Sequence, residues 1–329
     1  MKIGKVPNKL LDELVIKKMK IHNDRVILSA GIGEDFGALD FGEEYCIISG
    51  DPVTGATKHA GRIAVHVASN DIATCGVAPV AIHTTILLPP GTTEAELGAL
   101  ADEIAAEADA LGVSVIGGHT EVTDAVNRTV ISITAFGAAR RGHCVTAGGA
   151  RAGDALVMTK SAGLEGTAII AAEREDELTG RFGAEPIERA KRLSADISVV
   201  REGVIAGAFG VNAMHDATEG GVFGAAWEMA EASGKGITLN ENDIHVLDET
   251  RDICTYYNID AYRLISSGSM LIATDKPDGL ISALRNAGID ARQVAVFTAN
   301  PEERYTIGTD GARVVLEQPG ADELYKVLI

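Results

Sequence analysis

The segment ASNDIATCGVAP, residues 68–79, decides the interpretation of this chain because it joins two regular elements through a turn. Residues 62–75 have the apolar spacing of a helix, and Gly76 ends it. Residues 80–88 alternate apolar and polar side chains like a half-buried strand. The segment therefore predicts a helix–turn–strand unit that carries the acidic side chain of Asp71 on its helix.

Strands and helices are also predicted to alternate on both sides of this unit, which indicates an α+β chain. Its 329 residues exceed the usual size of one core, and the glycine-rich residues 147–154 are the expected boundary. We therefore expect domains at residues 1–147 and 154–329. Residues 31–42 are too rich in glycine and acid for a core element. The other expected strands are 25–30, 45–49, 113–116, 129–137, 155–159, 211–214, 269–274, 294–297, 305–307 and 313–316, and the other expected helices are 8–19, 93–111, 163–174, 194–206, 220–232, 277–287 and 321–328.

The composition excludes several classes of partner. With 29 basic and 47 acidic residues the formal charge is −18, which disfavours nucleic acid and anionic membrane. No run of 18 apolar residues predicts a membrane span, and no signal peptide is visible, so we expect a cytoplasmic protein. A phosphate-bearing ligand would then need divalent metal and backbone N–H groups. The acidity is equally explained by solubility alone.

Four aspartates share one sequence setting: each stands near turn-forming residues beside an apolar strand or helix. They are Asp35, Asp51, Asp71 and Asp216. Side chains at the ends of elements can converge from distant parts of a chain, and Mg²⁺ prefers carboxylate and phosphate oxygens. Taken singly, each aspartate is better explained as a cap or turn residue. Together they favour a metal site.

Two glycine-rich segments could approach an anion closely: residues 117–120, GGHT, after an expected strand, and residues 218–221, TEGG, before an expected helix. The phosphate-binding loop pattern GxxxxGK[ST] is absent, and residues 31–37 lack the last glycine of GxGxxG. A dinucleotide site is therefore not indicated.

The order of these motifs resembles the aminoimidazole ribonucleotide synthetase (PurM-like) superfamily. The matching segments are GIGED (31–35), DPVT (51–54), residues 68–79, GGHTEV (117–122) and HDATEGGV (215–222). The resemblance implies an N-terminal domain that forms a shared β-barrel with its twin in a homodimer, followed by a C-terminal α/β sandwich. It implies ATP at the dimer interface, with its phosphates bridged by Mg²⁺.

The resemblance also implies roles for individual residues. Asp35, Asp51 and Asp71 would hold metal. The nucleotide would be bound by Asn70, Gly117, Gly118, Thr120 and Asp216. His119 and Glu121 are the candidates for catalysis. For His119 and His215, a structural role is as well supported as a catalytic one, and Lys58 and His59 are better explained as solvated loop residues.

Within the superfamily, HDATEGGV is most similar to the HypE branch, which serves hydrogenase maturation. That branch ends in a cysteine whose thiol accepts a carbamoyl group, whereas this chain ends at Ile329, and Cys254 is a poor substitute. We therefore expect an ATP-dependent enzyme that activates an amide or carbonyl oxygen by phosphorylation, with a small-molecule or protein-borne acceptor. The alternatives are a non-catalytic nucleotide-binding partner in a maturation complex and a kinase resembling thiamine monophosphate kinase.

Overall fold

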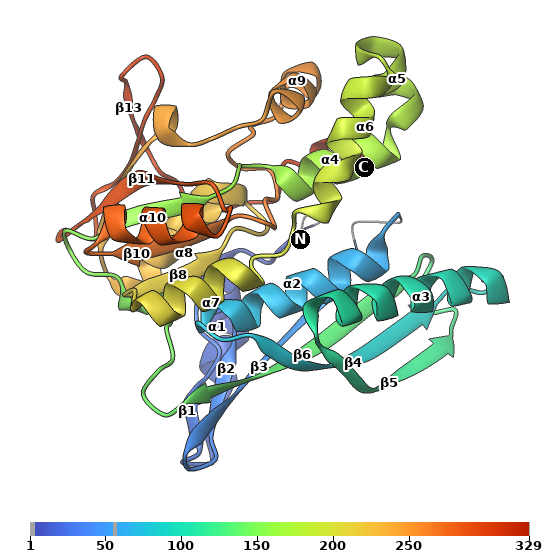
Figure 1. Cartoon of the computed structure of the whole chain (residues 1–329), viewed down its shortest axis with the longest axis horizontal. Helices are drawn as coiled ribbons and strands as arrows, with labels where there is room; N and C mark the ends of the chain where they lie inside the picture. The colour runs from blue at the N-terminus through green and yellow to red at the C-terminus, as the bar shows by residue number, and fades with distance from the viewer. Residues whose placement is uncertain (1–3, 55–57, 329) are drawn as a thin grey trace.

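The computed structural model describes residues 4–54 and 58–328 and contains two mixed sheets, each with helices packed on it (Figure 1). The first sheet has six strands, antiparallel except for the parallel pair β4 and β5. In spatial order they are β1 (Val26–Leu28), β2 (Gly37–Asp40), β3 (Glu44–Val53), β6 (Val130–Arg140), β4 (Pro79–Leu88) and β5 (Ser114–Val122). The helices of this half are α1 (Asn8–Leu14), α2 (Ala60–Thr74) and α3 (Glu94–Leu111).

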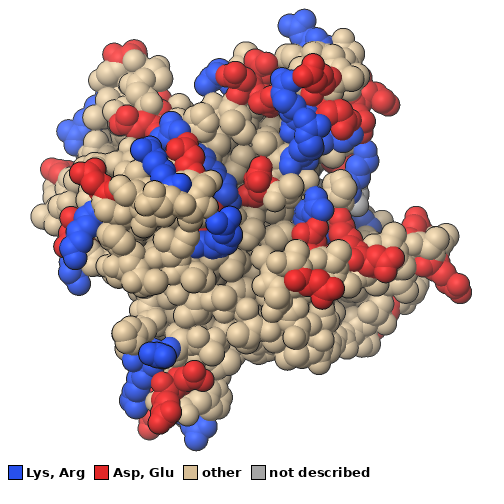
Figure 2. All heavy atoms as spheres, in the orientation of Figure 1, with Lys and Arg blue, Asp and Glu red and all other residues tan. Residues whose placement is uncertain are grey.

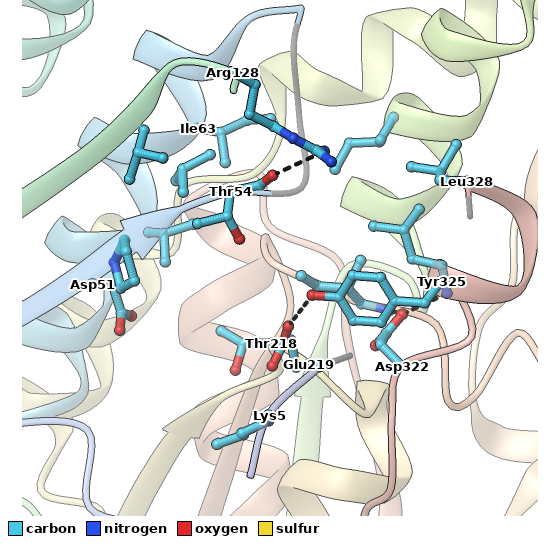
Figure 3. Close-up of a pocket in the computed structure, with 18 of the residues that line it drawn as sticks. Lys5, Asp51, Thr54, Ile63, Arg128, Thr218, Glu219, Asp322, Tyr325 and Leu328 are labelled. Atoms are coloured by element: carbon cyan, nitrogen blue, oxygen red, sulfur yellow. Dashed lines mark hydrogen bonds between the residues drawn. The ribbon is translucent and has the colours of Figure 1, made fainter. Parts of the chain in front are cut away.

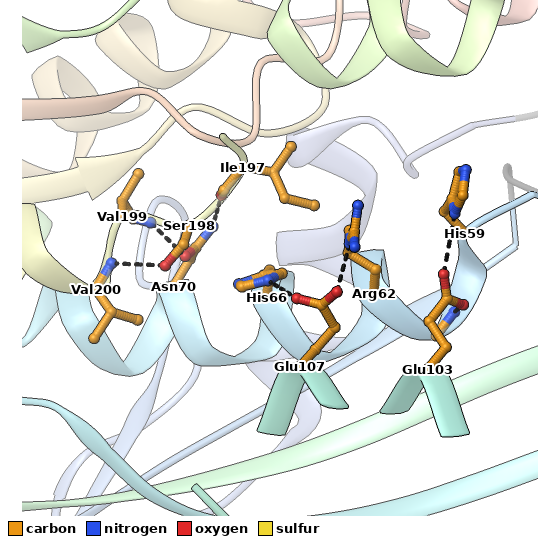
Figure 4. A network of polar contacts seen from close by, with 11 residues as sticks. His59, Arg62, His66, Asn70, Glu103, Glu107, Ile197, Ser198, Val199 and Val200 are labelled. Atoms are coloured by element: carbon orange, nitrogen blue, oxygen red, sulfur yellow. Dashed lines mark hydrogen bonds and ion pairs between the residues drawn. The ribbon is translucent and has the colours of Figure 1, made fainter. Parts of the chain in front are cut away.

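Helix α2 is the central element of the molecule. Its Ala, Val and Ile side chains are buried on almost every side, because it packs against the first sheet, α3 and the second domain. Figure 4 shows how α3 is held: Glu107 on α3 accepts from Arg62 Nε at 2.6 Å and lies 2.9 Å from His66 Nε2. Helix α2 is therefore fixed from three directions.

The second sheet has seven strands and is covered on both faces. Its spatial order is β13 (Arg313–Val315), β12 (Arg304–Ile307), β9 (Gly236–Asn240), β11 (Ala291–Thr298), β7 (Ala155–Thr159), β10 (Met270–Thr274) and β8 (Ala213–Asp216). Helices α7 (Val200–Phe209) and α10 (Pro277–Asn286) share a buried cluster with one face, and α8 (Gly221–Ser233) shares a second cluster with the other. The remaining helices are α4 (Leu164–Glu173), α5 (Glu175–Phe182), α6 (Ala184–Arg192), α9 (Asp248–Tyr257) and α11 (Tyr325–Leu328).

The two halves meet where α2 crosses α7, and glycine makes that crossing close. A Cβ added to Gly203 would lie 2.2 Å from the carbonyl oxygen of Ala73, and one added to Gly207 would lie 2.5 Å from the carbonyl oxygen of Gly76. Any larger side chain at either position would push the helices apart. Ala73 of α2 also belongs to the buried cluster that holds Met214 of β8. The end of α2 is thus part of the second domain's core.

The expected α+β architecture is confirmed, and several local expectations are wrong. Residues 31–42 contain strand β2, in which Ala38 is buried by pairing with β3. Residues 194–199 lie in a 3₁₀ turn and a loop before α7. Helices α5, α6 and α9 were not expected at all. None of the described helices is long and apolar enough to cross a bilayer.

Charged side chains of both signs stand side by side over the α5–α6 lobe (Figure 2). Lys191 pairs there with Glu175 at 2.9 Å and with Glu188 at 2.8 Å. Lys191 thus joins α5 to α6 through local ion pairs.

Candidate functional site

Four aspartates from four different elements meet at the junction of the two halves. Asp35 lies in the loop between β1 and β2, Asp51 in β3, Asp71 in α2 and Asp216 at the end of β8. Asp71 and Asp216 are 5% and 1% exposed. Burial, followed by the charges of the other three aspartates, raises the pKa of Asp71 well above its ordinary value. The residues expected to hold a metal are therefore brought together with Asp216.

Asp71 is oriented by a serine that the sequence did not single out. Ser49 Oγ lies 2.5 Å from Asp71 Oδ2, to which it donates, and 2.8 Å from the carbonyl oxygen of Asp35. Asp51 stands two residues further along the same strand, and burial raises its pKa although a hydrogen bond with Asp71 opposes the rise. Strand β3 thus supplies one member of the cluster and the support for another.

His215 stands beside the cluster as a buried cation. Its Nδ1 lies 2.7 Å from Asp35 Oδ1, and its Nε2 lies 3.2 Å from Glu228 Oε2. Burial lowers its pKa, but Asp35 and Glu228 outweigh burial and hold the pKa of His215 well above its ordinary value. Since both ring nitrogens face carboxylates, His215 is placed to orient Asp35.

Glu228 of α8 holds His215 in place on the side away from Asp35. Its Oε1 lies 3.4 Å from Lys5 Nζ and accepts from Asn8 Nδ2 at 3.2 Å. Burial raises the pKa of Glu228, but the hydrogen bond from His215 and the charge of Lys5 outweigh it and lower the pKa to about 2. Glu228 therefore stays charged and balances two cations.

The donor set fits a hard divalent cation. Both carboxylate oxygens of Asp216 are buried without a hydrogen-bond partner, and so is Glu34 Oε2. One oxygen each of Asp35 and Asp216 lies with a His215 nitrogen in a group spanning at most 4.8 Å. Buried carboxylates without donors are costly unless a cation or protons balance them. Carboxylate oxygens are the ligands that Mg²⁺ accepts, so Asp35, Asp51, Asp71 and Asp216 are suited to it.

Asn70, next to Asp71, joins the two domains. Its Nδ2 donates to the carbonyl oxygen of Ile197 at 2.8 Å, and its Oδ1 accepts the backbone N–H of Val199 at 2.8 Å (Figure 4). Both contacts are buried. The side chain that was expected to bind nucleotide is thus occupied by backbone of the second domain, and it fixes the position of α2 there.

The GGHTE segment lies apart from the carboxylates within one chain. Residues 117–121 are inside β5, an edge strand on which every residue is exposed, and not in a turn after it. Gly118 is in register with Asp51 across the sheet through Ile133 and Thr84, a separation of three strand spacings or about 14 Å. The structure therefore does not bring Gly117, Gly118, His119, Thr120 and Glu121 to the four aspartates.

Close packing against the neighbouring strand β4 explains why residue 118 is a glycine. A Cβ on Gly118 would lie 2.4 Å from the carbonyl oxygen of Thr84 in β4, closer than real Cβ atoms come. His119 Nε2 lies 2.9 Å from Glu121 Oε2, and both side chains are exposed. The two candidates for catalysis thus contact each other on the open edge of the sheet.

A cleft of about 1000 Å³ opens beside the carboxylate cluster (Figure 3). Asp51 lines it on one side, and Thr218 and Glu219 line it from the loop before α8. Tyr325 of α11 crosses to this loop and donates its hydroxyl to Glu219 Oε1 at 2.8 Å. The cleft therefore lies between the two halves, with the C-terminal segment as one wall.

The structure also places three further residues considered from the sequence, Lys58, His59 and Cys254, in contacts or buried positions that account for them. Lys58 donates to the carbonyl oxygen of Ala172 at 2.8 Å, and so contacts the second domain. His59 lies 3.1 Å from Glu103 of α3. Cys254 is 4% exposed, and burial raises the pKa of its thiol to about 12, so it is not a thiolate near neutral pH.

Family models cover most of the chain. Residues 33–139 match the N-terminal domain of AIR synthase related proteins, and residues 151–308 match their C-terminal domain. The chain belongs to the AIR synthase related family. The four aspartates lie within the two matched regions: Asp35, Asp51 and Asp71 in the first and Asp216 in the second.

This chain is similar to family members whose names refer to hydrogenase expression and formation or to HypE. It is 27% identical to a hydrogenase expression/formation protein of Methanocaldococcus jannaschii, over 98% of this chain and 97% of that protein. It is 26% identical to the carbamoyl dehydratase HypE of Rhodobacter capsulatus, over 95% of this chain and 92% of that protein. These family members are matched over nearly their whole length.

Solved structures of HypE share the fold. HypE in its complex with HypF has a TM-score of 0.77 at 19% identity, covering 94% of this chain and 99% of that one. HypE in complex with ATP has a TM-score of 0.70 at 18% identity, covering 97% of this chain and 96% of that one. The two-domain fold of this AIR synthase related chain is therefore the fold of HypE.

Several residues that build the site were not found from sequence. Ser49 contacts Asp71, Glu228 contacts His215, and Lys5 contacts Glu228, although the three lie far apart in the sequence. Only Ser49 carried a signal, since it lies two residues before Asp51 and faces the same side of the strand. Nothing in the sequence around Glu228 distinguishes it from acidic residues on exposed helices, although α8 is largely buried.

Proposed function

We propose that this protein binds ATP with Mg²⁺ at the four aspartates and uses it to activate a carbonyl or amide oxygen by phosphorylation. The observation that carries the proposal is the buried group of Asp35, Asp51, Asp71 and Asp216, in which Asp216 has no partner for either oxygen. The similarity to carbamoyl dehydratases and the shared fold with an ATP complex of HypE support the choice of nucleotide.

The residues of the chain would then have distinct tasks. The four aspartates would hold Mg²⁺, which when bound would neutralise charge on the phosphates being transferred. Ser49 would keep Asp71 in position, and His215 would keep Asp35 oriented. The cleft between the halves would hold the acceptor next to Asp51 and exclude water from it.

We further propose that a second copy of the chain completes this site. The exposed strand β5 supports this, because it presents Val115, Ile116 and Val122 to solvent at 48%, 61% and 61% exposure. Pairing of two such edges in a shared barrel would cover these side chains. It would also bring the GGHTE segment of one copy toward the aspartates of the other.

The test is a screen for phosphate release from ATP and Mg²⁺ with carbamoyl, amide and amine compounds, with each product identified by its mass. Sustained turnover with one class of compound supports the proposed enzyme. Transfer of phosphate that remains on the product indicates a kinase. Tight ATP binding without turnover in every case would refute the enzyme and leave a nucleotide-binding partner of a maturation complex.

A further inference from the structure

Two of the four cysteines of the chain meet at the C-terminal end of helix α2. Cys75 directly follows the last residue of α2, and Cys144 lies in the segment that leads from β6 to the second domain. Their Sγ atoms are 2.8 Å apart, although 69 residues separate them in the chain. The other two cysteines, Cys46 and Cys254, lie in β3 and α9. The fold therefore brings together a pair of thiols that the sequence holds far apart.

The geometry of this pair is close to that of a disulfide. An S–S bond is about 2.05 Å long, so the two sulfurs need to approach by only about 0.8 Å to be bonded. Two cysteines cannot be bridged without backbone movement when their side chains point apart. Here the thiol of Cys75 donates to Sγ of Cys144, so the two side chains already point toward each other.

The two thiols differ in their access to solvent. Cys75 is fully buried, whereas Cys144 is half-buried. The hydrogen bond with Cys144, followed by burial, raises the pKa of the Cys75 thiol well above its usual range. A reagent from solution therefore reacts first at Cys144, and Cys75 is placed to react with whatever forms there.

The pair lies where the interdomain segment rests on α2. The backbone N–H of Val145 donates to the carbonyl oxygen of Cys75 at 3.1 Å. The side chain of Val145 packs on the buried cluster that contains Met214 of β8. Gly76, the residue after Cys75, stands at the close crossing of α2 and α7 described above. A covalent bond between the two sulfurs would therefore fasten the interdomain segment to the helix that joins the two halves.

We propose that Cys75 and Cys144 form a reversible modification site, which a small-molecule disulfide oxidises to an intrachain disulfide. The thiolate of Cys144 attacks one sulfur of the reagent, forms a mixed disulfide with it and releases the first thiol. Cys75 then loses its proton to water, and its sulfur attacks Sγ of Cys144, which releases the second thiol. Two electrons and two protons pass from the pair to the reagent, and a dithiol reverses the exchange.

The test uses the full chain, reduced with dithiothreitol, freed of it, and incubated with oxidised glutathione at pH 8. The intact mass should fall by the mass of two hydrogen atoms, and a digest made without reductant should contain a peptide pair that joins Cys75 to Cys144. The bridge closes a loop of 69 residues, so the melting temperature should rise by about 5 °C. Dithiothreitol should reverse both changes.

Three results would overturn the proposal. The first is a chain that keeps all four free thiols, and the second is a glutathione adduct that persists on Cys144. The third is a bridge that leaves the melting temperature unchanged, because such a bridge would not fasten the interdomain segment. None of these measurements uses ATP, so they test the bridge independently of the proposed function.

The variant Cys144→Ser assigns both changes to the pair. It replaces a half-buried thiol by a hydroxyl of similar size, so the reduced variant should fold, and oxidised glutathione should change neither its mass nor its melting temperature. Cys46→Ser is the matched control, since it removes another half-buried thiol and should keep both changes. Cys75→Ser should stop the exchange at the glutathione adduct on Cys144. A rise in melting temperature that persists in Cys144→Ser would refute the assignment.

Discussion

The carboxylate cluster and the GGHTE segment are linked by the six-stranded sheet, which carries both Asp51 and the GGHTE segment, but the two regions have opposite surroundings. Asp71 and Asp216 are buried, and this burial, followed by the charges of neighbouring aspartates, raises their pKa values well above the ordinary value. His119 and Glu121 are exposed on an edge strand and contact each other. The first region is assembled by one chain from both domains, whereas the second has no assembled surroundings within the chain. The difference indicates that only half of the proposed site is built by folding alone.

The largest effect should come from Asp71→Asn. The amide keeps the contact with Ser49 but removes one negative oxygen from the cluster, so Mg²⁺-dependent ATP affinity should fall by about a hundredfold or more. Removing a buried, repelled charge should leave the folded state intact. Calorimetry with and without Mg²⁺ measures the change, with Asp176→Asn, at an exposed acidic position on α5, as the control. Unchanged affinity would mean that the buried region is not the metal site.

Glu228→Gln should lower the free energy of unfolding by an amount that depends on pH. The pKa of Glu228 falls from 4.5 to about 2 on folding, so its charge contributes about 3 kcal/mol of stability that is present above pH 4.5. This contribution is lost as pH falls from 4.5 toward 2. Urea unfolding at pH 7, 5 and 4 should show the deficit of the variant shrinking only at the lowest pH.

Glu231→Gln, on the same helix but exposed, is the control for Glu228→Gln. It should change the free energy of unfolding by less than about 1 kcal/mol. A Glu228→Gln deficit that grows as the solution is acidified would contradict the assignment of Glu228 as the charged partner of His215.

Asn70→Ala should have a smaller effect on stability. It leaves the N–H of Val199 and the carbonyl of Ile197 buried without partners, which should lower the free energy of unfolding by about 2 kcal/mol. Urea unfolding measures the loss, and Asn286→Ala on the exposed side of α10 should change little. An unchanged free energy of unfolding in Asn70→Ala would show that the buried region does not depend on this contact between domains.

The smallest effect is expected in the exposed region, from Ile116→Glu. If a second copy covers β5, a buried charge in that interface should weaken the dimer by about tenfold or more without changing the fold. Light scattering over a range of concentrations measures the mass. Val315→Glu, an exposed apolar position on the edge strand β13 of the other sheet, is the control. An identical mass for both variants and the unchanged chain at all concentrations would remove the reason for assigning β5 to an interface.

Sequence patterns predicted the elements whose period is long and regular. Residues 62–75 form α2 as Ala60–Thr74, and 93–111 form α3 as Glu94–Leu111, where Thr93 and Glu96 form a capping box. The strand at residues 37–40 was missed because four residues with one buried alanine carry no readable alternation. Pairing with β3, a tertiary contact, decides its conformation.

The candidate site was predicted only in part, for a similar reason. Acidic residues near the ends of elements could be recognised, but their meeting depends on how α2 crosses α7, which no local pattern contains. The glycines at 117 and 118 were expected to follow a strand that ends at residue 116, and the register of β5 on β4 places them inside that strand. Glu228 differs from other glutamates only in burial, and burial follows from the whole fold.

Asn70 and Asp71 are consecutive residues, so their Cα atoms are about 3.8 Å apart. One side chain is fastened to the second domain, and the other belongs to the proposed ion site. Any rotation of the second domain would therefore be transmitted to Asp71 through one peptide unit in a rigid, buried helix. The position of Asp71 in the proposed ion site therefore depends directly on how the two domains are aligned. By the reciprocity of linked equilibria, an ion that prefers one alignment must in turn hold the domains in it.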